Sequence, residues 1–174
     1  REMFSACGIV GVRDAEQSGD LLRSIGVPGE LVRHTGDDAL LFESAALGAG
    51  PIFPHGKILV GVNLRDASTY QKGFAKARPA EFAAWLDGIA AQHAVHFVFI
   101  PVSYDGQDDD RASARAVVAA MAANECATVI EEEFDAAGIR ELCGRMDLAL
   151  GISYHFLLFS LAAGVPSLLL FQNA

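Results

Sequence analysis

The chain has 174 residues, of which 52% are hydrophobic, and its formal net charge at pH 7 is −9. This composition is typical of a globular protein with a sizeable core and excludes an intrinsically disordered chain. The acidic balance, with a sequence pI near 4.9, also argues against a nucleic-acid partner, because phosphate binding requires a basic face.

In chain order, the first 57 residues predict the end of one domain and a linker. The expected elements are a strand at 7–12, a helix at 18–25 that Gly26 ends, and short extended pieces at 31–32 and 40–42. Glycine and proline are frequent from Gly48 to Gly56, which is typical of a linker. We therefore expect residues 1–43 to be the C-terminal part of a first α/β domain and residues 44–57 to connect it to a second.

Residues 58–174 alternate strands with helices. The expected strands are 58–64, 95–102, 128–130, 148–150 and 167–171, and the expected helices begin near Pro79, Asp108, Asp135 and Tyr154. In the first of these helices Phe82, Trp85, Leu86 and Ile89 follow the spacing of an amphipathic helix. The alternation predicts βαβ units with a parallel sheet. We therefore expect an α/β, Rossmann-like second domain over 58–174, incomplete at its C-terminus.

The apolar block 146–171 is long enough to raise the question of a membrane span, since about 20 apolar residues cross a bilayer. Gly164 and Pro166 interrupt it, and proline removes a backbone donor and disfavours helix at the residue before it. A helix and a strand buried in an α/β core explain the block better, so we expect no membrane span.

The three cysteines, Cys7, Cys126 and Cys143, are widely spaced and include no C-x-x-C pair. They fit neither a disulfide framework nor a zinc site, which favours a reducing, cytoplasmic location. No apolar segment near Arg1 has the length of a signal peptide core. Because the chain lacks a starting methionine and stops soon after an apolar strand, we expect a fragment of a longer polypeptide.

Polar residues follow the ends of the expected strands, and in a parallel sheet these ends lie along one edge. They are Asn63, Arg65, Asp66, Ser103, Tyr104, Asp105, Glu131, Glu132, Ser153, Tyr154 and His155. Arg65 is able to grip a carboxylate or phosphate with two hydrogen bonds, or it forms a surface ion pair. His155, in the first turn of a helix, is a candidate acid, base or donor to an anion. The alternative is a buried histidine bonded to a carbonyl.

Other polar clusters predict no metal or cofactor site. The Asp108–Asp110 run complements a helix dipole more readily than it holds a metal. His93 and His96 fall on different elements and are interpreted as structural. Gly48-Ala-Gly50 lacks the third glycine of a dinucleotide loop, and there is no P-loop or Gly-x-Ser-x-Gly motif.

Four stretches, taken in order, form a recognisable set. They are Val12-Arg-Asp14 with Ser18, Leu21-Leu22 and Gly26-Val27; Gly61-Val-Asn-Leu-Arg65; Ile100-Pro-Val-Ser103 with Asp108-Asp109; and Met146 to Gly151 through His155 to Gly164-Val-Pro166. Together they resemble the polysaccharide pyruvyl transferases, a family built from two Rossmann-like domains in the GT-B manner. The resemblance implies one half of a GT-B-like architecture. It also implies transfer of a pyruvyl group from phosphoenolpyruvate, or a related anion, to a sugar of a cell-surface polysaccharide or its precursor.

The resemblance also implies residue roles. Arg65 lies where the family has an anion-binding arginine, and His155 matches the histidine of the family's Arg-x-His motif. We expect these two to be catalytic and the substrate to contact Asn63, Tyr104, Asp105, Ser153, Tyr154 and Glu131. Ser153 replaces the motif's arginine, which removes a charge-assisted contact of about 1.5–3 kcal/mol per hydrogen bond.

Two alternatives remain open. One is a GT-B-like glycosyltransferase that uses a nucleotide-sugar, with Glu131–Glu133 near the ribose. The other, motivated by Ser153, is a non-catalytic anion- or sugar-binding domain derived from such an enzyme. We also expect uncovered apolar faces near Ile9 and Leu169 to favour a homo-oligomer.

Overall fold

The computed structural model describes residues 2–41, 43–44, 47, 50–64 and 78–170. The chain divides into two compact units, Arg1–Leu41 and Phe42–Ala174. Within the described part, no helix has both the length and the apolar character needed to cross a membrane. The expected positions Arg65, Asp66 and Phe171 lie outside the described residues.

The first unit pairs two short parallel strands. Its elements are α1 (Glu2–Ser5), β1 (Val10–Val12), a π-helical turn (Ala15–Gly19), α2 (Asp20–Ser24), β2 (Val32–His34) and a 3₁₀ helix (Asp38–Leu41). Val10, Val12, Val27 and Val32 form its core. Asp14 caps the π-helical turn, and its hydrogen bonds from the Ser18 side chain and backbone lower the pKa of its carboxyl.

Two local expectations for this unit need correction. The helix expected at 18–25 is divided between the π-helical turn and α2. The extended piece expected at 40–42 is wrong over its described residues, which end a 3₁₀ helix. The Ala39 N–H donates to the Asp37 side chain at 3.0 Å, and such a bond favours a turn over a strand.

The second unit is a five-stranded parallel sheet with the order β5-β4-β3-β6-β7. The strands are β3 (Ile58–Asn63), β4 (Val95–Phe99), β5 (Ala127–Val129), β6 (Leu148–Gly151) and β7 (Ser167–Leu169). The chain runs outward from β3 to β5 and then places β6 on the other side of β3. This order is that of a Rossmann-like sheet, as expected from the alternating pattern.

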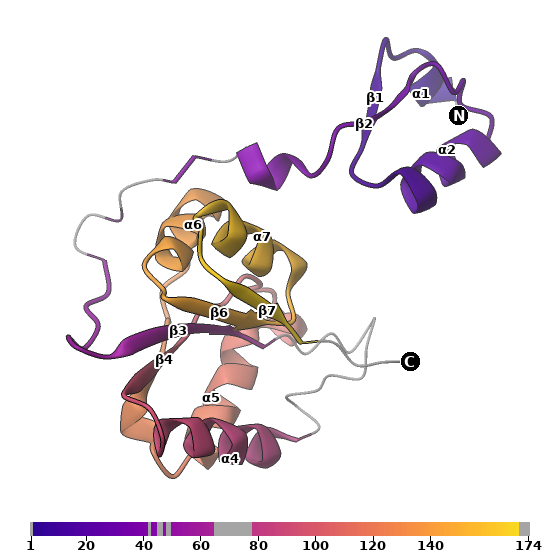
Figure 1. Cartoon of the computed structure of the whole chain (residues 1–174). Coiled ribbons are helices and arrows are strands. Elements are labelled where there is room, and N and C mark those ends of the chain that lie inside the picture. Colours follow the sequence, from indigo (N-terminus) through magenta and orange to yellow (C-terminus); the bar gives the residue numbers. More distant parts are fainter. Residues whose placement is uncertain (1, 42, 45–46, 48–49, 65–77, 171–174) are drawn as a thin grey trace. The chain divides into compact units, whose positions relative to one another are not determined.

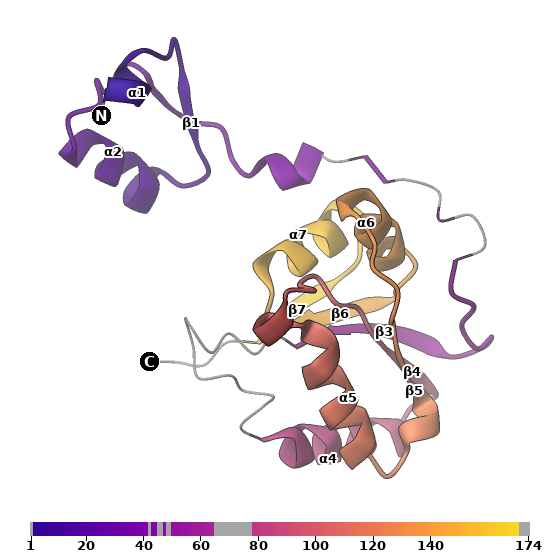
Figure 2. The same ribbon diagram turned by 180° about the vertical axis from the view of Figure 1, so that it is seen from behind.

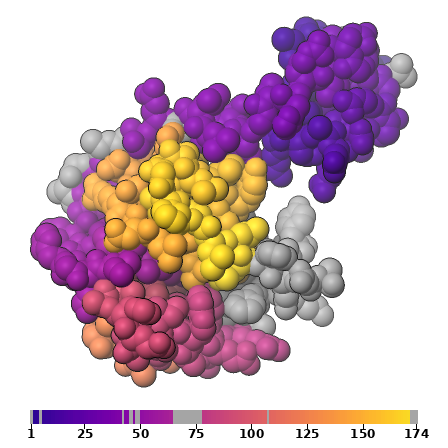
Figure 3. All heavy atoms as spheres, viewed as in Figure 1, coloured from indigo at the N-terminus to yellow at the C-terminus, as the bar shows by residue number. Residues whose placement is uncertain are grey.

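Helices cover both faces of this sheet (Figures 1 and 2). They are α4 (Pro79–Ala90), α5 (Asp110–Ala120), α6 (Ala136–Gly144) and α7 (Tyr154–Ala162). The first two lie on one face and the last two on the other. In the space-filling view, the orange and yellow atoms of α6, α7 and β7 lie together on one side of the unit (Figure 3).

Local sequence signals explain where these elements begin and end. Pro79 occupies the first turn of α4, where its missing N–H costs nothing. Asp109 and Asp135 cap α5 and α6 by accepting bonds from backbone N–H groups. Strand β4 ends at Phe99, before the expected Val102, and Pro101 has no N–H to continue a ladder.

The core between the sheet and α4 and α5 contains Val62, Leu86, Phe97 and Val117, none of them exposed to solvent. The amphipathic pattern of α4 was therefore predicted correctly except at one position. Trp85, expected on the buried face, keeps 45% of its surface exposed.

Candidate functional site

The polar residues expected at the site follow strands whose carboxyl ends share one edge of the sheet. In open α/β sheets, ligands bind outside these ends, at the point where the strand order reverses. Here that point lies between β3 and β6. The residues that follow these two strands are therefore the ones to consider first.

Asn63, the last residue of β3, is 1% exposed and joins several elements. Its Nδ2 donates to the Ile100 carbonyl at 2.9 Å and to Asp110 Oδ2 at 3.1 Å. Its Oδ1 accepts from the Ser153 N–H at 3.2 Å. The side chain thus ties β3 to the segment after β4 and to the starts of α5 and α7.

Asp110, the first residue of α5, is 2% exposed and was not singled out as a site residue from the sequence. Its Oδ2 also accepts from the N–H groups of Val102 and Ser103, at 2.9 and 3.0 Å. A buried carboxylate with several donors fixes the loop that donates to it. No local pattern distinguishes Asp110 from Asp108 and Asp109, so only the tertiary structure could reveal this role.

Two glycines allow the start of α7 to lie close against the sheet. A Cβ on Gly151 would lie 2.6 Å from the Phe156 ring, and one on Gly61 would lie 2.8 Å from Met146 and 3.4 Å from the Phe156 ring. Phe156 is fully buried. The distance at Gly151 is too short for a side chain beside a fixed ring, so this position requires glycine. At Gly61 a side chain would require the flexible Met146 to move.

The first turn of α7 presents the predicted residues in different environments. Ser153 precedes the helix and is 4% exposed, whereas Tyr154 is 50% exposed. His155 is exposed, and its ring lies edge-on to that of Tyr154 with centroids 5.6 Å apart. The alternative of a buried histidine is therefore wrong, and the imidazole is accessible to a ligand.

Tyr104 lies beyond β4 and links two loops. Its hydroxyl donates to the Pro101 carbonyl at 3.3 Å and accepts from the Phe134 N–H at 3.2 Å. Burial raises the pKa of this hydroxyl. The Arg111 guanidinium lies 5.1 Å from the ring centroid, within cation–π range. Asp105, the next residue, is exposed.

Arg111 and Arg115 on α5 form hydrogen bonds with acidic residues near the carboxyl ends of β4 and β5. Arg111 binds both oxygens of Asp109 and donates to the Glu131 carbonyl at 3.0 Å. Arg115 binds both carboxylate oxygens of Glu131. These hydrogen bonds lower the pKa of the Asp109 and Glu131 carboxyls.

The structure therefore separates the predicted site residues into two groups. Asn63, Ser153, Tyr154 and His155 belong to the ends of β3 and β6, while Tyr104 and Glu131 belong to the ends of β4 and β5. Two residues adjacent in sequence belong to different groups. Asp110 accepts from Asn63 in the first group, and Asp109 pairs with Arg111, which also donates to Glu131 in the second. Within the described ranges, no cluster of three or more His, Cys, Asp or Glu side chains is arranged to hold a metal ion.

The fold is similar to that of known structures. A crystal structure described as a UDP-N-acetylglucosamine 2-epimerase from Listeria monocytogenes superposes with a TM-score of 0.60 at 16% sequence identity. The match covers 91% of this chain and 41% of the other, so the chain spans about two fifths of that protein's length. No curated protein sequence matches the chain.

The fold class expected from the sequence, a Rossmann-like α/β sheet of the GT-B-like kind, is confirmed by this similarity. The sequence profile described as polysaccharide pyruvyl transferase matches residues 1–170. The chain belongs to the polysaccharide pyruvyl transferase family, as its four stretches predict.

Proposed function

We propose that the protein transfers a pyruvyl group from phosphoenolpyruvate to a sugar of a cell-surface polysaccharide or its precursor. The observation that carries this proposal is the family match over residues 1–170. The exposed His155 at the start of α7, beside the reversal of strand order, supports it.

In this reaction the oxygens of two sugar hydroxyls bond to C2 of phosphoenolpyruvate and the bond from C2 to the phosphate oxygen breaks. The methylene carbon takes one proton, and the other hydroxyl proton leaves with inorganic phosphate. The first N–H groups of α7 have no partner within the helix and favour a nearby anion. We assign Arg65 to binding of the donor anion and His155 to supplying the proton or binding the anion. Asn63 and Ser153 contribute by holding α7, as their hydrogen bond indicates.

The test is phosphate release by the full-length protein with phosphoenolpyruvate and a panel of nucleotide-sugar and lipid-linked acceptors. His155→Ala should reduce the rate by about 10²-fold or more, the usual contribution of a general acid. His93→Ala is the matched control, because His93 is also exposed but follows the C-terminal end of α4, whereas His155 lies in the first turn of α7. The proposal fails if no acceptor supports phosphate release and calorimetry detects no binding of phosphoenolpyruvate.

The Rossmann-like strand order also suits a nucleotide-sugar donor. In that reaction Glu131 would bind the ribose, but its carboxylate is held by Arg115 and would have to share or release that partner. Saturable binding of a uridine or guanosine diphosphate sugar, without binding of phosphoenolpyruvate, would favour this second function.

The third function to test is non-catalytic binding of an anion or a sugar, for which Ser153 in place of the family arginine is the reason. If loss of the family arginine is what abolished catalysis, Ser153→Arg should increase the affinity of the protein for phosphoenolpyruvate. Because Ser153 is 4% exposed, the new side chain would have to extend out of a buried position. Strong activity of the unaltered full-length protein would exclude this function.

A further inference from the structure

We propose that Asp110 is a positioning residue for His155 and acts through the side chain of Asn63. Asp110 is 2% exposed at the first position of α5, so it offers no surface to a substrate. Its carboxylate instead determines which end of the Asn63 amide faces α7. This inference rests on the proposed function, because it concerns the residue to which that function assigns proton transfer or anion binding.

Three N–H groups converge on one oxygen of the Asp110 carboxylate. Asp110 Oδ2 accepts from Asn63 Nδ2 at 3.1 Å and from the backbone N–H groups of Val102 and Ser103 at 2.9 and 3.0 Å. The Asp110 N–H in turn donates to the Ser103 carbonyl at 3.0 Å. A carboxylate has no donor of its own and its charge strengthens each bond, whereas an amide would bring an NH₂ group among these donors. This position therefore favours aspartate over asparagine.

Two acceptors on one side of Asn63 fix the orientation of its amide. Nδ2 donates to Asp110 and, at 2.9 Å, to the Ile100 carbonyl. The Oδ1 end therefore faces Ser153, whose N–H donates to it at 3.2 Å. With the amide reversed, Oδ1 would face two acceptors and Nδ2 would face the Ser153 N–H, and both contacts are repulsive. The carboxylate thus selects the orientation that anchors Ser153.

Ser153 transmits this anchoring to the first turn of α7. Its carbonyl accepts from the Leu157 N–H at 3.2 Å, which closes the turn that contains His155. Among the described residues, the Ser153 side chain makes no capping hydrogen bond, in contrast to the capped starts of α5 and α6. The Ile152 N–H also donates to the Asn63 carbonyl at 3.1 Å. Asn63 therefore holds both residues that precede the helix.

Hydrogen exchange measured by NMR on the 174-residue protein tests this role without any substrate. At matched free energies of unfolding, the Ser153 amide should exchange about tenfold or more faster in Asp110→Asn than in Val117→Ala, as expected for loss of one hydrogen bond. Val117 is the matched control because it is buried in the core about two turns further along α5. Its truncation weakens the protein without changing the acceptors of Asn63.

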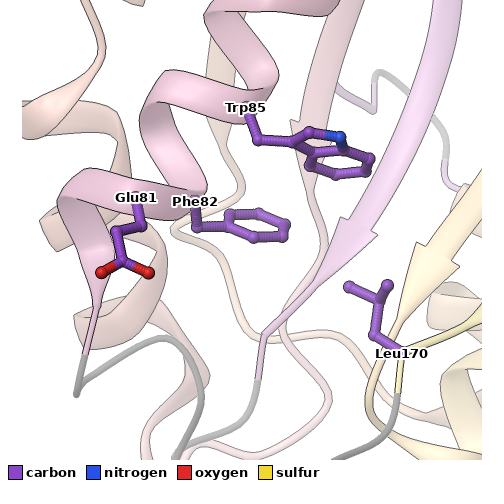
Figure 4. A pocket seen from close by; sticks show the side chains of 4 residues that line it. All are labelled: Glu81, Phe82, Trp85 and Leu170. Carbon is purple, nitrogen blue, oxygen red and sulfur yellow. The ribbon is translucent and has the colours of Figure 1, made fainter.

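The fluorescence of Trp85 provides the common stability scale. Trp85 is the only tryptophan in the chain and lies beside Phe82 on α4, with ring centroids 5.4 Å apart (Figure 4). Denaturant titration followed by its emission gives the concentrations at which the two variants have equal free energies of unfolding. Exchange compared at those concentrations separates local release of α7 from general destabilisation.

The His155 imidazole provides a second readout. Asp110→Asn should shift its Hε1 signal, whereas the signal of His93, which follows α4, should not move. Val117→Ala should shift neither signal. In the full-length protein, kcat of Asp110→Asn should be about tenfold or more below that of Val117→Ala, since misplacing a catalytic group by about 1 Å costs about 10²-fold.

The proposal is overturned if a folded Asp110→Asn protein keeps the Ser153 exchange rate and the His155 signal of the unaltered protein. A kcat equal to that of Val117→Ala would overturn it too. Absence of phosphate release by the unaltered full-length protein would refute the proposed function, but exchange and NMR would still decide whether Asp110 positions His155.

If Asp110→Asn does not fold, the unaltered protein decides. The side-chain amide hydrogens of Asn63 should exchange with solvent about tenfold or more slowly than those of Asn124, which is exposed. Equally fast exchange of the two amides would show that Asp110 does not hold Asn63 and would overturn the proposal.

Discussion

Among single residues, Asn63 joins separate segments at the carboxyl edge of the sheet through the hydrogen bonds of its side-chain amide. Both hydrogens of its amide are donated, one to Ile100 and one to Asp110, and its oxygen accepts from Ser153. A buried amide with these partners cannot also bind a ligand without giving one of them up. Its effect on any reaction at His155 therefore passes through the position of α7.

We predict that Asn63→Ala lowers the free energy of unfolding by about 2–4 kcal/mol, because it leaves a buried carboxylate and a buried N–H without this partner. Chemical denaturation followed by circular dichroism measures this change. Asn124→Ala, at an exposed position, is the control and should change the value by less than about 0.5 kcal/mol. Equal effects of the two substitutions would contradict the role of Asn63.

Asn63→Asp adds a pH dependence to the same test. It places a second carboxyl about 3.1 Å from Asp110 Oδ2, and like charges raise the pKa of at least one of the pair. Because the pKa is raised in the folded state, Asn63→Asp lowers the free energy of unfolding at neutral pH. This destabilisation is relieved as the pH falls and one carboxyl takes a proton. The difference in unfolding free energy between the variant and the unaltered protein should therefore be smaller at pH 4 than at pH 7.

At the scale of elements, Phe156 determines how closely α7 approaches β6. The ring occupies the space that a side chain at Gly151 would fill, and it also borders Gly61, whose nearest neighbour is Met146. The helix therefore begins close against the strands. Glycine at position 151 is thus a packing requirement of the helix start that carries His155. Neither glycine has a positive φ, so the requirement comes from close contact and not from backbone conformation.

Gly151→Ala should destabilise the protein by about 1–3 kcal/mol, the usual cost of overpacking a core, since its Cβ would lie 2.6 Å from the ring. Gly88→Ala on α4 is the matched control, because nothing lies within 4 Å of a Cβ there and alanine is the better helix former. Thermal melting should show a lower midpoint for the first and an unchanged or higher midpoint for the second. A neutral Gly151→Ala would show that α7 shifts easily and that the packing is not restrictive.

At the scale of the whole molecule, several large apolar side chains are exposed on the last elements. Leu161 on α7 is 56% exposed, and Leu168 and Leu169 on the edge strand β7 are 55% and 50% exposed. In the first unit Ile9 is 67% exposed. Exposed apolar surface on an unpaired strand edge favours association with another chain.

We therefore predict that the 18.4 kDa chain self-associates, with an interface of roughly 1,200 Å² or more if a stable dimer forms. Sedimentation over a range of concentrations should show a mass above that of the monomer. Leu169→Lys should shift it toward the monomer, whereas Ile52→Lys, at a position 93% exposed in a loop, should not. A single species of monomer mass with a cooperative melt would contradict the prediction.

The parallel α/β class, the approximate helix starts of the second unit and the family all follow from the sequence alone. These depend on signals that act within one turn, such as Pro79 and the caps at Asp109 and Asp135, or on short motifs read in order. The strand order, the burial of Asn63 and Asp110 and the exposure of Trp85 emerge only when the chain is folded. Asn63 and Ser153 are 90 residues apart in the chain, and no local pattern encodes a contact that depends on which strands become neighbours.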